Sequence, residues 1–372
     1  MKLMNEFYEI LNDPYAYGRR YKEKRKRKII GYFCSYTPEE IVFAAGAHPM
    51  RLFGTRGDIA LADAHLQSYS CSLVRGALEE ALAGRLDFLD GTVFPHTCDS
   101  IQRLSDVWRL NTDFGFFADV VLPVKLDTDS AKQYMIDVLK KFRRDLEKGL
   151  DVSITDDNLK EAIEKYNRIR KYLKTIYELR SKDPGIVTGR DTYAIVRAAM
   201  IMDRDYLLKK LPGVIEELKR KEPSSGMQKK RVILVGSICD HPDIYRILED
   251  VDGVVVWDDL CTGSRYFEGV TDTDGDPINS LAKRYAERLI CPAKHISLTA
   301  RGDQIVNLVK ENDAQGVVFL LLKFCEPHAF DYPYMKEYLD RENIPSLLLE
   351  MEDQLPAEGQ LLTRFETFIH ML

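Results

Sequence analysis

A continuous apolar run, residues 316–324, ends directly at Cys325 and is followed by Glu326-Pro327-His328. A run of this length without alternation is typical of a strand buried on both faces of a parallel sheet. In open α/β sheets, ligands bind outside the carboxyl ends of the strands. The run therefore predicts an α/β fold and locates Cys325 at the edge where such folds do their chemistry.

Cysteines follow predicted strands repeatedly along the chain. Cys34, Cys98, Cys239 and Cys261 also come at or shortly after a predicted strand, so five of the seven cysteines share this position. We interpret them as lining a crevice rather than as scattered core thiols. An odd number of cysteines and an N-terminus unlike a secretory signal argue against a disulfide framework. The lack of any C-x-x-C pair argues against a zinc ribbon or a thioredoxin motif. Inert thiols, a metal or iron–sulfur site and a redox pair stay open.

Composition limits the class of protein. The chain has 372 residues, of which 45% are apolar and 30% are charged, which is typical of a soluble globular protein with two domains. The net charge of -6 gives no reason to expect a nucleic-acid partner. No apolar run approaches the roughly 18 residues of a membrane helix. We therefore expect a cytoplasmic protein with no membrane partner.

The order of predicted elements suggests four segments. We expect a helical arm over 1–28, a first α/β domain over 29–126, a helical segment over 127–222 packed on that domain, and a second α/β domain over 227–372. Expected strands are 28–33, 49–54, 88–94, 116–124, 231–235, 253–257, 316–324 and 346–350. Expected helices are 2–28, 39–47, 66–82, 130–148, 155–181, 189–209, 214–221, 242–249, 277–289, 300–312, 334–343 and 361–371. Because strands and helices alternate within each domain, the sheets should be parallel and their strand ends should face one cleft.

Two local features bear on a site. The loop after the first strand offers Ser35 and backbone N–H groups to an anionic or carbonyl ligand, with Thr37 as the predicted N-cap of a capping box completed by Glu40. A plain turn role for Ser35 stays open. Cys71 lies in the first turns of the expected helix 66–82, where the helix N-terminus lowers a thiol pKa.

Motifs along most of the chain are similar to those of one known family. GYFCSYTPEEI at 31–41 and AAGAHP at 44–49 resemble the opening of the benzoyl-CoA reductase / 2-hydroxyacyl-CoA dehydratase superfamily, in particular a subunit like the 2-hydroxyglutaryl-CoA dehydratase D-component. DDLCTGSRYF at 258–267, KFCEPHAFDYP at 323–333 and GQLLTR at 359–364 agree with it. The resemblance extends from about residue 28 to the end of the chain.

The resemblance implies two Rossmann/flavodoxin-like domains that hold one [4Fe-4S] cluster. The family's cysteine pattern falls on Cys71, Cys98 and Cys325, which leaves one iron open to substrate, water or a sulfur ligand. The remaining thiols are interpreted as core or supporting residues, namely Cys34, Cys239, Cys261 and Cys291. The histidines beside the cluster loops are interpreted as hydrogen-bond donors, namely His96, His241 and His328. A double-cubane [8Fe-9S] cluster, for which Cys239 would be the telling position, stays open.

The resemblance also implies a reaction and partners. A separate ATP-hydrolysing [4Fe-4S] activator supplies single low-potential electrons, which reach a CoA thioester and give a ketyl radical anion that leads to dehydration or ring reduction. A homologous second subunit, in a heterodimer or larger assembly, is expected. Because G-x-x-x-x-G-K-[ST] and G-x-G-x-x-G are both absent, the chain is neither the ATPase nor a nicotinamide enzyme.

Residues for this chemistry are predicted near the first strand. Ser35 is the candidate donor to developing negative charge, and His48, Glu39 and His96 are candidate proton donors. Three rival functions stay open: a double-cubane reductase of small molecules, a non-catalytic electron-relay subunit and a binding protein with inert thiols.

Overall fold

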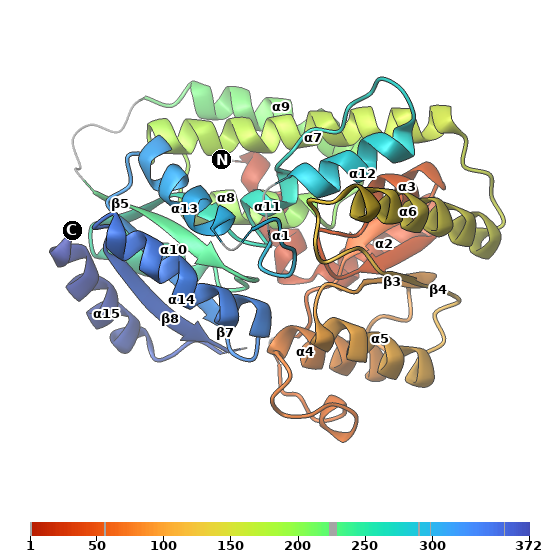
Figure 1. Ribbon diagram of the computed structural model, residues 1–372, viewed down its shortest axis with the longest axis horizontal. Helices are drawn as coiled ribbons and strands as arrows, with labels where there is room; N and C mark the ends of the chain where they lie inside the picture. Colours follow the sequence, from red (N-terminus) through yellow and green to blue (C-terminus); the bar gives the residue numbers. More distant parts are fainter. Residues whose placement is uncertain (1, 56, 223–228, 289–290, 298, 353) are drawn as a thin grey trace.

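Two four-stranded parallel sheets form the framework of the computed structural model, which describes residues 2–55, 57–222, 229–288, 291–297, 299–352 and 354–372 (Figure 1). The strands are β1 (Ile29–Tyr32), β2 (His48–Arg51), β3 (Gly91–Pro95), β4 (Phe116–Val120), β5 (Lys230–Gly236), β6 (Gly253–Asp259), β7 (Gly316–Leu322) and β8 (Ser346–Met351). The strand orders in space are β2-β1-β3-β4 and β6-β5-β7-β8. In both sheets, the strand that comes first in the chain therefore lies between the second and the third, and the fourth lies at the edge. This is the order of flavodoxin-like doubly wound sheets. The predicted α/β fold with two similar parallel-sheet domains is confirmed.

The second sheet is buried on both faces, as its apolar strands require. Along β5, Val232 and Leu234 pack in one hydrophobic cluster with α10 (Asp243–Asp250) and α15 (Glu358–Met371). Ile233 and Val235 pack in another with α13 (Ala300–Glu311) and α14 (Glu326–Arg341). Successive side chains of a strand point to opposite faces, so a helix pair covers each side. At the end of β5 only glycine fits, because a Cβ on Gly236 would collide with the carbonyl oxygen of Leu320 on β7.

The N-terminal half contains shorter helices than the sequence predicts. The expected helix 2–28 is two helices, α1 (Lys2–Asn12) and α2 (Pro14–Arg25), because Asp13 caps the second one and Pro14 begins it. The first sheet also carries α3 (Glu39–Ala44), α4 (Ser72–Leu82) and α5 (Asp99–Asn111). The predicted capping box at Thr37 is wrong: the helix begins without a side-chain cap, and Glu40 forms a buried ion pair with Arg170 instead.

The middle of the chain is helical, but its breaks differ from those predicted. The helices are α6 (Asp129–Leu150), α7 (Asp156–Lys182), α8 (Gly189–Ala199) and α9 (Arg204–Lys219). The expected helix 189–209 divides where Asp203 caps α9, and α9 then continues through Pro212. Burial of Leu211 and Val214 beside that proline outweighs the lost backbone hydrogen bond. In the part of the chain that is described, no helix is long and apolar enough to cross a membrane.

The second domain adds two more helices, α11 (Ser264–Phe267) and α12 (Pro277–Glu287). Its largest departure from the sequence prediction is α14, which begins at Glu326 rather than 334 and runs through Pro333. Pro327 in its first turn is compatible with a helix start because the amide nitrogens there have no intrahelical partner. Cys325 is therefore directly at the start of a helix.

Buried polar contacts join the two domains. Tyr177 of α7 donates to a carboxylate oxygen of Asp258 at the end of β6 (2.6 Å), and Arg51 of β2 donates to the carbonyl oxygen of Cys261 (3.2 Å). Helix α7 packs against α3 and α9 and also against β6, so the helical segment contacts both sheets (Figure 1). These contacts fix the strand ends of the two domains relative to each other.

Candidate functional site

Three cysteines occupy the same position on three helices. Cys71, Cys98 and Cys325 are the residues immediately before α4, α5 and α14, at their N-caps. Two of these helices belong to the first domain and one to the second, and Figure 1 shows the end of β7, which leads into α14, directed toward α4. The sequence predicts Cys71 inside a helix that begins at residue 66, whereas α4 begins at Ser72.

The three thiols lie close enough together to influence one another. Burial and, to a smaller extent, the neighbouring thiols of Cys71, Cys34 and Cys291 raise the pKa of Cys98 to about 12. Burial likewise raises the pKa of Cys325 well above its usual value, with added contributions from Cys71, Cys98 and Cys261. The structure therefore gathers the three predicted ligands, with further thiols beside them, in one region.

Each sulfur also faces a backbone amide of its own helix. Against the effect of burial, the N–H groups of Val74, Ile101 and His328 lower the pKa of the thiol three residues earlier. Amides at a helix N-terminus stabilise an anionic sulfur. For Cys71 the sequence predicted a lowered thiol pKa, which is wrong for the metal-free chain because burial outweighs the amides and raises the pKa.

This donor set suits a cluster better than a single ion. All seven cysteines are free, and in the described ranges no three His, Cys, Asp or Glu side chains are placed to share one metal ion. An iron–sulfur cluster binds each thiolate on a different iron, so its ligands lie farther apart. Metal binding removes the thiol protons and supplies positive charge, which offsets the cost of burying thiolates. The residues present therefore fit an iron–sulfur cluster.

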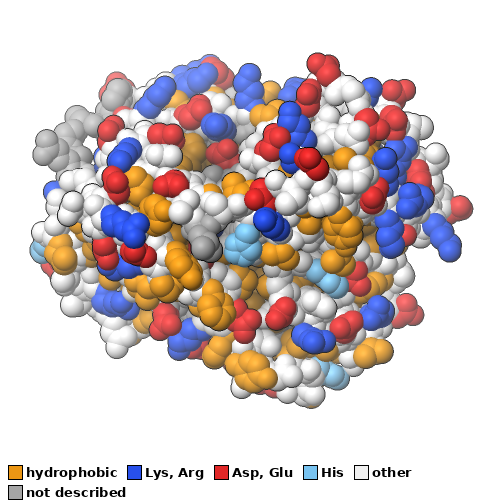
Figure 2. Space-filling model, viewed as in Figure 1, with side chains coloured by type: hydrophobic (Ala, Val, Ile, Leu, Met, Phe, Trp, Pro, Cys, Tyr) orange, Lys and Arg blue, Asp and Glu red, His pale blue; other side chains and the backbone are white. Residues whose placement is uncertain are grey.

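A cavity of about 430 Å³ opens beside Cys98. Its walls come from the start of α5, the first turns of α14 and the loop around Lys294, a residue 1% exposed. Lys294 donates to the carbonyl oxygen of Leu122 (3.0 Å), and burial lowers its pKa. Hydrophobic side chains gather over α14 on the face drawn in Figure 2. Phe330 and Tyr334 of α14 are exposed. The volume is within the range of small-molecule sites.

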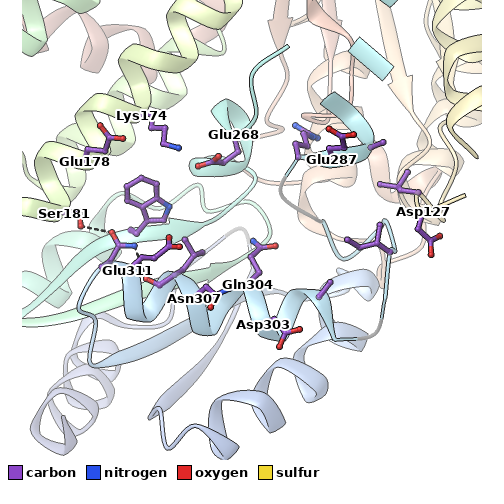
Figure 3. A pocket seen from close by; sticks show the side chains of 18 of the residues that line it. Asp127, Lys174, Glu178, Ser181, Glu268, Glu287, Asp303, Gln304, Asn307 and Glu311 are labelled. Atoms are coloured by element: carbon purple, nitrogen blue, oxygen red, sulfur yellow. Dashed lines mark hydrogen bonds between the residues drawn. The ribbon is translucent and has the colours of Figure 1, made fainter. Parts of the chain in front are cut away.

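A larger cavity, of about 1040 Å³, lies between α7, α12 and α13 and has no cysteine among its lining residues (Figure 3). Carboxylates outnumber cations in its lining. The acidic residues are Asp127, Glu178, Glu268, Glu287, Asp303 and Glu311, and the basic ones are Lys132, Lys174, Lys182 and Arg288. An excess of negative charge disfavours a polyphosphate ligand in this cavity.

A buried charge network that no sequence pattern had revealed adjoins the thiols. Arg265 donates to both carboxylate oxygens of Asp259 (2.5 and 2.9 Å), and Arg301 donates to the same carboxylate (2.9 Å). Burial alone would raise the pKa of Asp259, but the two guanidinium groups lower it to about 2. Arg265 also donates to the Sγ of Cys261 and lies 3.3 Å from the Nε2 of His328. Only the DDLCTGSRYF motif marked this region in the sequence.

The predicted catalytic residues near the first strand lie in other surroundings. Ser35 accepts a hydrogen bond from Arg288 (3.2 Å), and Glu39 is ion-paired with Arg204 (2.6 Å). His48 lies 2.8 Å from the carbonyl oxygen of Ile201, and burial lowers its pKa to about 3. None of the three is among the residues that line the cavity beside Cys98. Their catalytic roles stay predictions.

Comparison with known proteins identifies the family. The sequence profile of 2-hydroxyglutaryl-CoA dehydratase, D-component, matches residues 34–372. The chain is 32% identical to the (R)-phenyllactyl-CoA dehydratase beta subunit of Clostridium sporogenes, covering 100% of this chain and 99% of that protein. It is 30% identical to one of the subunits of benzoyl-CoA reductase from Thauera aromatica, covering 91% and 89%. It is 27% identical to the (R)-2-hydroxyglutaryl-CoA dehydratase subunit beta of Acidaminococcus fermentans, covering 100% and 99%. The resemblance seen in the sequence is thus confirmed, and the chain belongs to the 2-hydroxyglutaryl-CoA dehydratase D-component family.

Proposed function

We propose that this chain is an iron–sulfur subunit of an acyl-CoA dehydratase or reductase and passes single low-potential electrons to a CoA thioester. The relatives are named as subunits of CoA-thioester dehydratases and of a benzoyl-CoA reductase, which supports the reaction class. The observation that carries the proposal is the set of three free cysteines at three helix N-caps from two facing domains.

In this proposal the chain's own residues hold and shield the cluster. Cys71, Cys98 and Cys325 would bind one [4Fe-4S] cluster, which when bound supplies one-electron reducing power and an open iron position. Cys71 is buried and the other two cysteines are half-buried, which limits the access of water to their thiolates. The helix amides stabilise the negative charge of the thiolates. The cavity beside Cys98 gives a small ligand access to this region.

Two protein partners belong to the proposal. A homologous second subunit is supported by the names of the relatives, each of which is described as one subunit of its enzyme. A separate ATP-hydrolysing activator is expected from the family resemblance, and the chain has no P-loop sequence of its own.

Anaerobic metal analysis tests the proposal. Protein co-purified with its partner, and corrected for the partner's own metal, should contain about four irons and about four sulfides per copy of this chain. Cys98→Ser and Cys325→Ser should each lose the cluster. Cys239→Ser is the matched control, since Cys239 is fully buried at the end of β5 and its backbone is hydrogen-bonded to Thr262. An intact cluster in Cys98→Ser or Cys325→Ser would refute the ligand assignment.

A second candidate is favoured by the additional thiols. Cys34 and Cys261 both act electrostatically on Cys291. Cys34 and Cys291 act on Cys98, and Cys261 acts on Cys325, which is compatible with a double-cubane cluster of about eight irons. An iron content near that value would support this alternative, and the absence of iron would exclude both clusters. If the chain only relays electrons and binds no substrate, the EPR spectrum of its cluster should not change when the thioester is added.

A further inference from the structure

His328 has a buried ring nitrogen without a hydrogen-bond partner in the described part of the chain. The residue is 3% exposed in the first turn of α14, and its backbone N–H donates to the carbonyl oxygen of Cys325 (3.1 Å). The nitrogen without a partner is Nδ1. The other histidines predicted beside the cluster loops differ in this respect. His96 pairs with Asp119 (2.8 Å), and His241 lies near the carbonyl oxygen of Glu352 (3.2 Å).

Arg265 determines which nitrogen of His328 carries the proton. Its Nη1 lies 3.3 Å from the Nε2 of His328. A guanidinium group has only donors, so Nε2 must accept and the proton must be on Nδ1. The two hydrogen bonds from Arg265 to Asp259 hold the guanidinium in place. The tautomer of His328 is thus set by a buried ion pair on another part of the fold.

The Nδ1–H group is therefore a buried donor that lacks an acceptor. Leaving such a group unpaired destabilises the folded protein, so an acceptor is expected when the site is complete. The surroundings are rich in sulfur: the same Nη1 of Arg265 donates to the Sγ of Cys261 at 3.3 Å, and Cys325 is three residues away on the same helix start.

We infer that the Nδ1–H of His328 donates a hydrogen bond to the sulfur atoms of the cluster held at Cys325. This inference rests on the proposed function. Hydrogen bonds to cluster sulfurs stabilise the more negative, reduced form and so raise the reduction potential. His328 is then a positioning residue that makes the cluster easier to reduce, and Arg265 with Asp259 keeps its proton on the correct nitrogen.

Three substitutions test the inference on the anaerobic complex of the chain with its partner. His328→Asn places an amide N–H near the position of Nδ1, His328→Gln places it near Nε2, and His328→Leu removes it. The midpoint potential of the cluster should shift to more negative values in His328→Leu and His328→Gln and return toward the wild-type value in His328→Asn. Pulsed EPR on reduced protein containing ¹⁵N-histidine should detect a weakly coupled ring nitrogen and an exchangeable proton in the wild type, and both should vanish in His328→Leu.

Every outcome separates the inference from the proposed function. If the wild-type protein binds no iron, the proposed function fails. If the wild-type protein binds the cluster but all three variants have the same midpoint potential as the wild type, the inference is overturned. The inference is also overturned if the potential of His328→Asn is as far from the wild-type value as that of His328→Leu. Should His328→Leu fail to assemble the cluster, recovery of iron in His328→Asn supports the inference, and equal loss in both overturns it. His370→Leu, at an exposed position on α15, is the matched control and should leave the potential unchanged.

Discussion

At the scale of single residues, two buried carboxylates beside the first strand are paired with arginines. Glu39 and Glu40, which follow the first strand in the sequence, form ion pairs with Arg204 and Arg170 of the helical segment. The guanidinium of Arg204 is fully buried. Removing one partner of such a pair leaves an uncompensated buried charge and costs about 3–5 kcal/mol. The acidic residues of this motif therefore have a structural task in addition to any role in chemistry.

His48→Gln should make the stability of the protein less dependent on pH. Burial lowers the pKa of His48 to about 3, below the value of about 6.5 in an unfolded chain. As pH falls below about 6.5, the unfolded state binds a proton that the folded state does not, so this histidine removes up to about 1.4 kcal/mol of stability per pH unit. A glutamine amide can donate to the carbonyl oxygen of Ile201 as Nε2 does, but it does not titrate.

The measurement is anaerobic urea unfolding at pH 7 and pH 5. The wild-type protein should lose more stability between these values than His48→Gln. If the wild-type protein and His48→Gln lose the same free energy of unfolding between pH 7 and pH 5, the lowered pKa of His48 is contradicted. If the variant keeps its stability at pH 7 but loses activity, the catalytic role that the sequence predicted for His48 gains support.

At the scale of elements, the helices of this fold begin in two ways. Several begin with side-chain caps, for example Thr155 on α7 and Asp276 on α12, whereas others, such as α3 and α10, begin without one. At α4, α5 and α14 a cysteine occupies the N-cap and makes no side-chain capping hydrogen bond. These three helix starts leave their amides available to sulfur at some loss of helix stability.

Cys98→Ser should therefore stabilise the metal-free protein relative to Cys98→Ala. Cys98 has an extended backbone (φ -155°, ψ 165°), which suits an N-cap, and serine is among the best capping residues. The expected gain is about 1 kcal/mol in the free energy of unfolding. Both variants should bind no cluster, so the comparison isolates the cap. Equal stabilities in chemical denaturation would show that α5 does not use this position as a cap.

The elements that the sequence predicts well are those that local pattern determines. The apolar runs of β5 and β7 are buried on both faces whatever surrounds them, so their position could be predicted. The path of α9 through Pro212 could not, because it depends on packing against other helices. The three cysteines were found through family motifs. The contact between Arg265 and His328 joins residues 63 positions apart and has no local signal.

At the scale of the whole molecule, the site lies where the two domains meet, so its geometry depends on their fixed arrangement. The backbone N–H of His295 donates to the carbonyl oxygen of Val124 (2.8 Å), and the N–H of Leu126 donates to the carbonyl oxygen of His295 (2.9 Å), so loops of the two domains are joined. Tyr285 also donates to the carbonyl oxygen of Thr37 (2.9 Å). One hydrophobic cluster contains Ile29 of the first sheet as well as Ile233 of the second. A cluster held by ligands from both sides needs this rigidity, because a small rotation would separate Cys325 from the other two cysteines.

The two tryptophans allow this coupling to be measured, since the chain has one in each domain. Trp108 packs against Phe33 in the first domain (ring centroids 5.6 Å apart), and Trp257 on β6 packs against Tyr177 (5.1 Å). Trp108→Phe and Trp257→Phe each leave one tryptophan, whose fluorescence reports on a single domain. In metal-free protein, the urea unfolding transition seen by this fluorescence should coincide with the transition seen by far-UV circular dichroism in both variants. Tyr177→Phe, which removes the hydrogen bond to Asp258, should lower the midpoints reported by both tryptophans together. Separate transitions for the two tryptophans would mean that the domains unfold independently and that the cluster, rather than the protein, sets their arrangement.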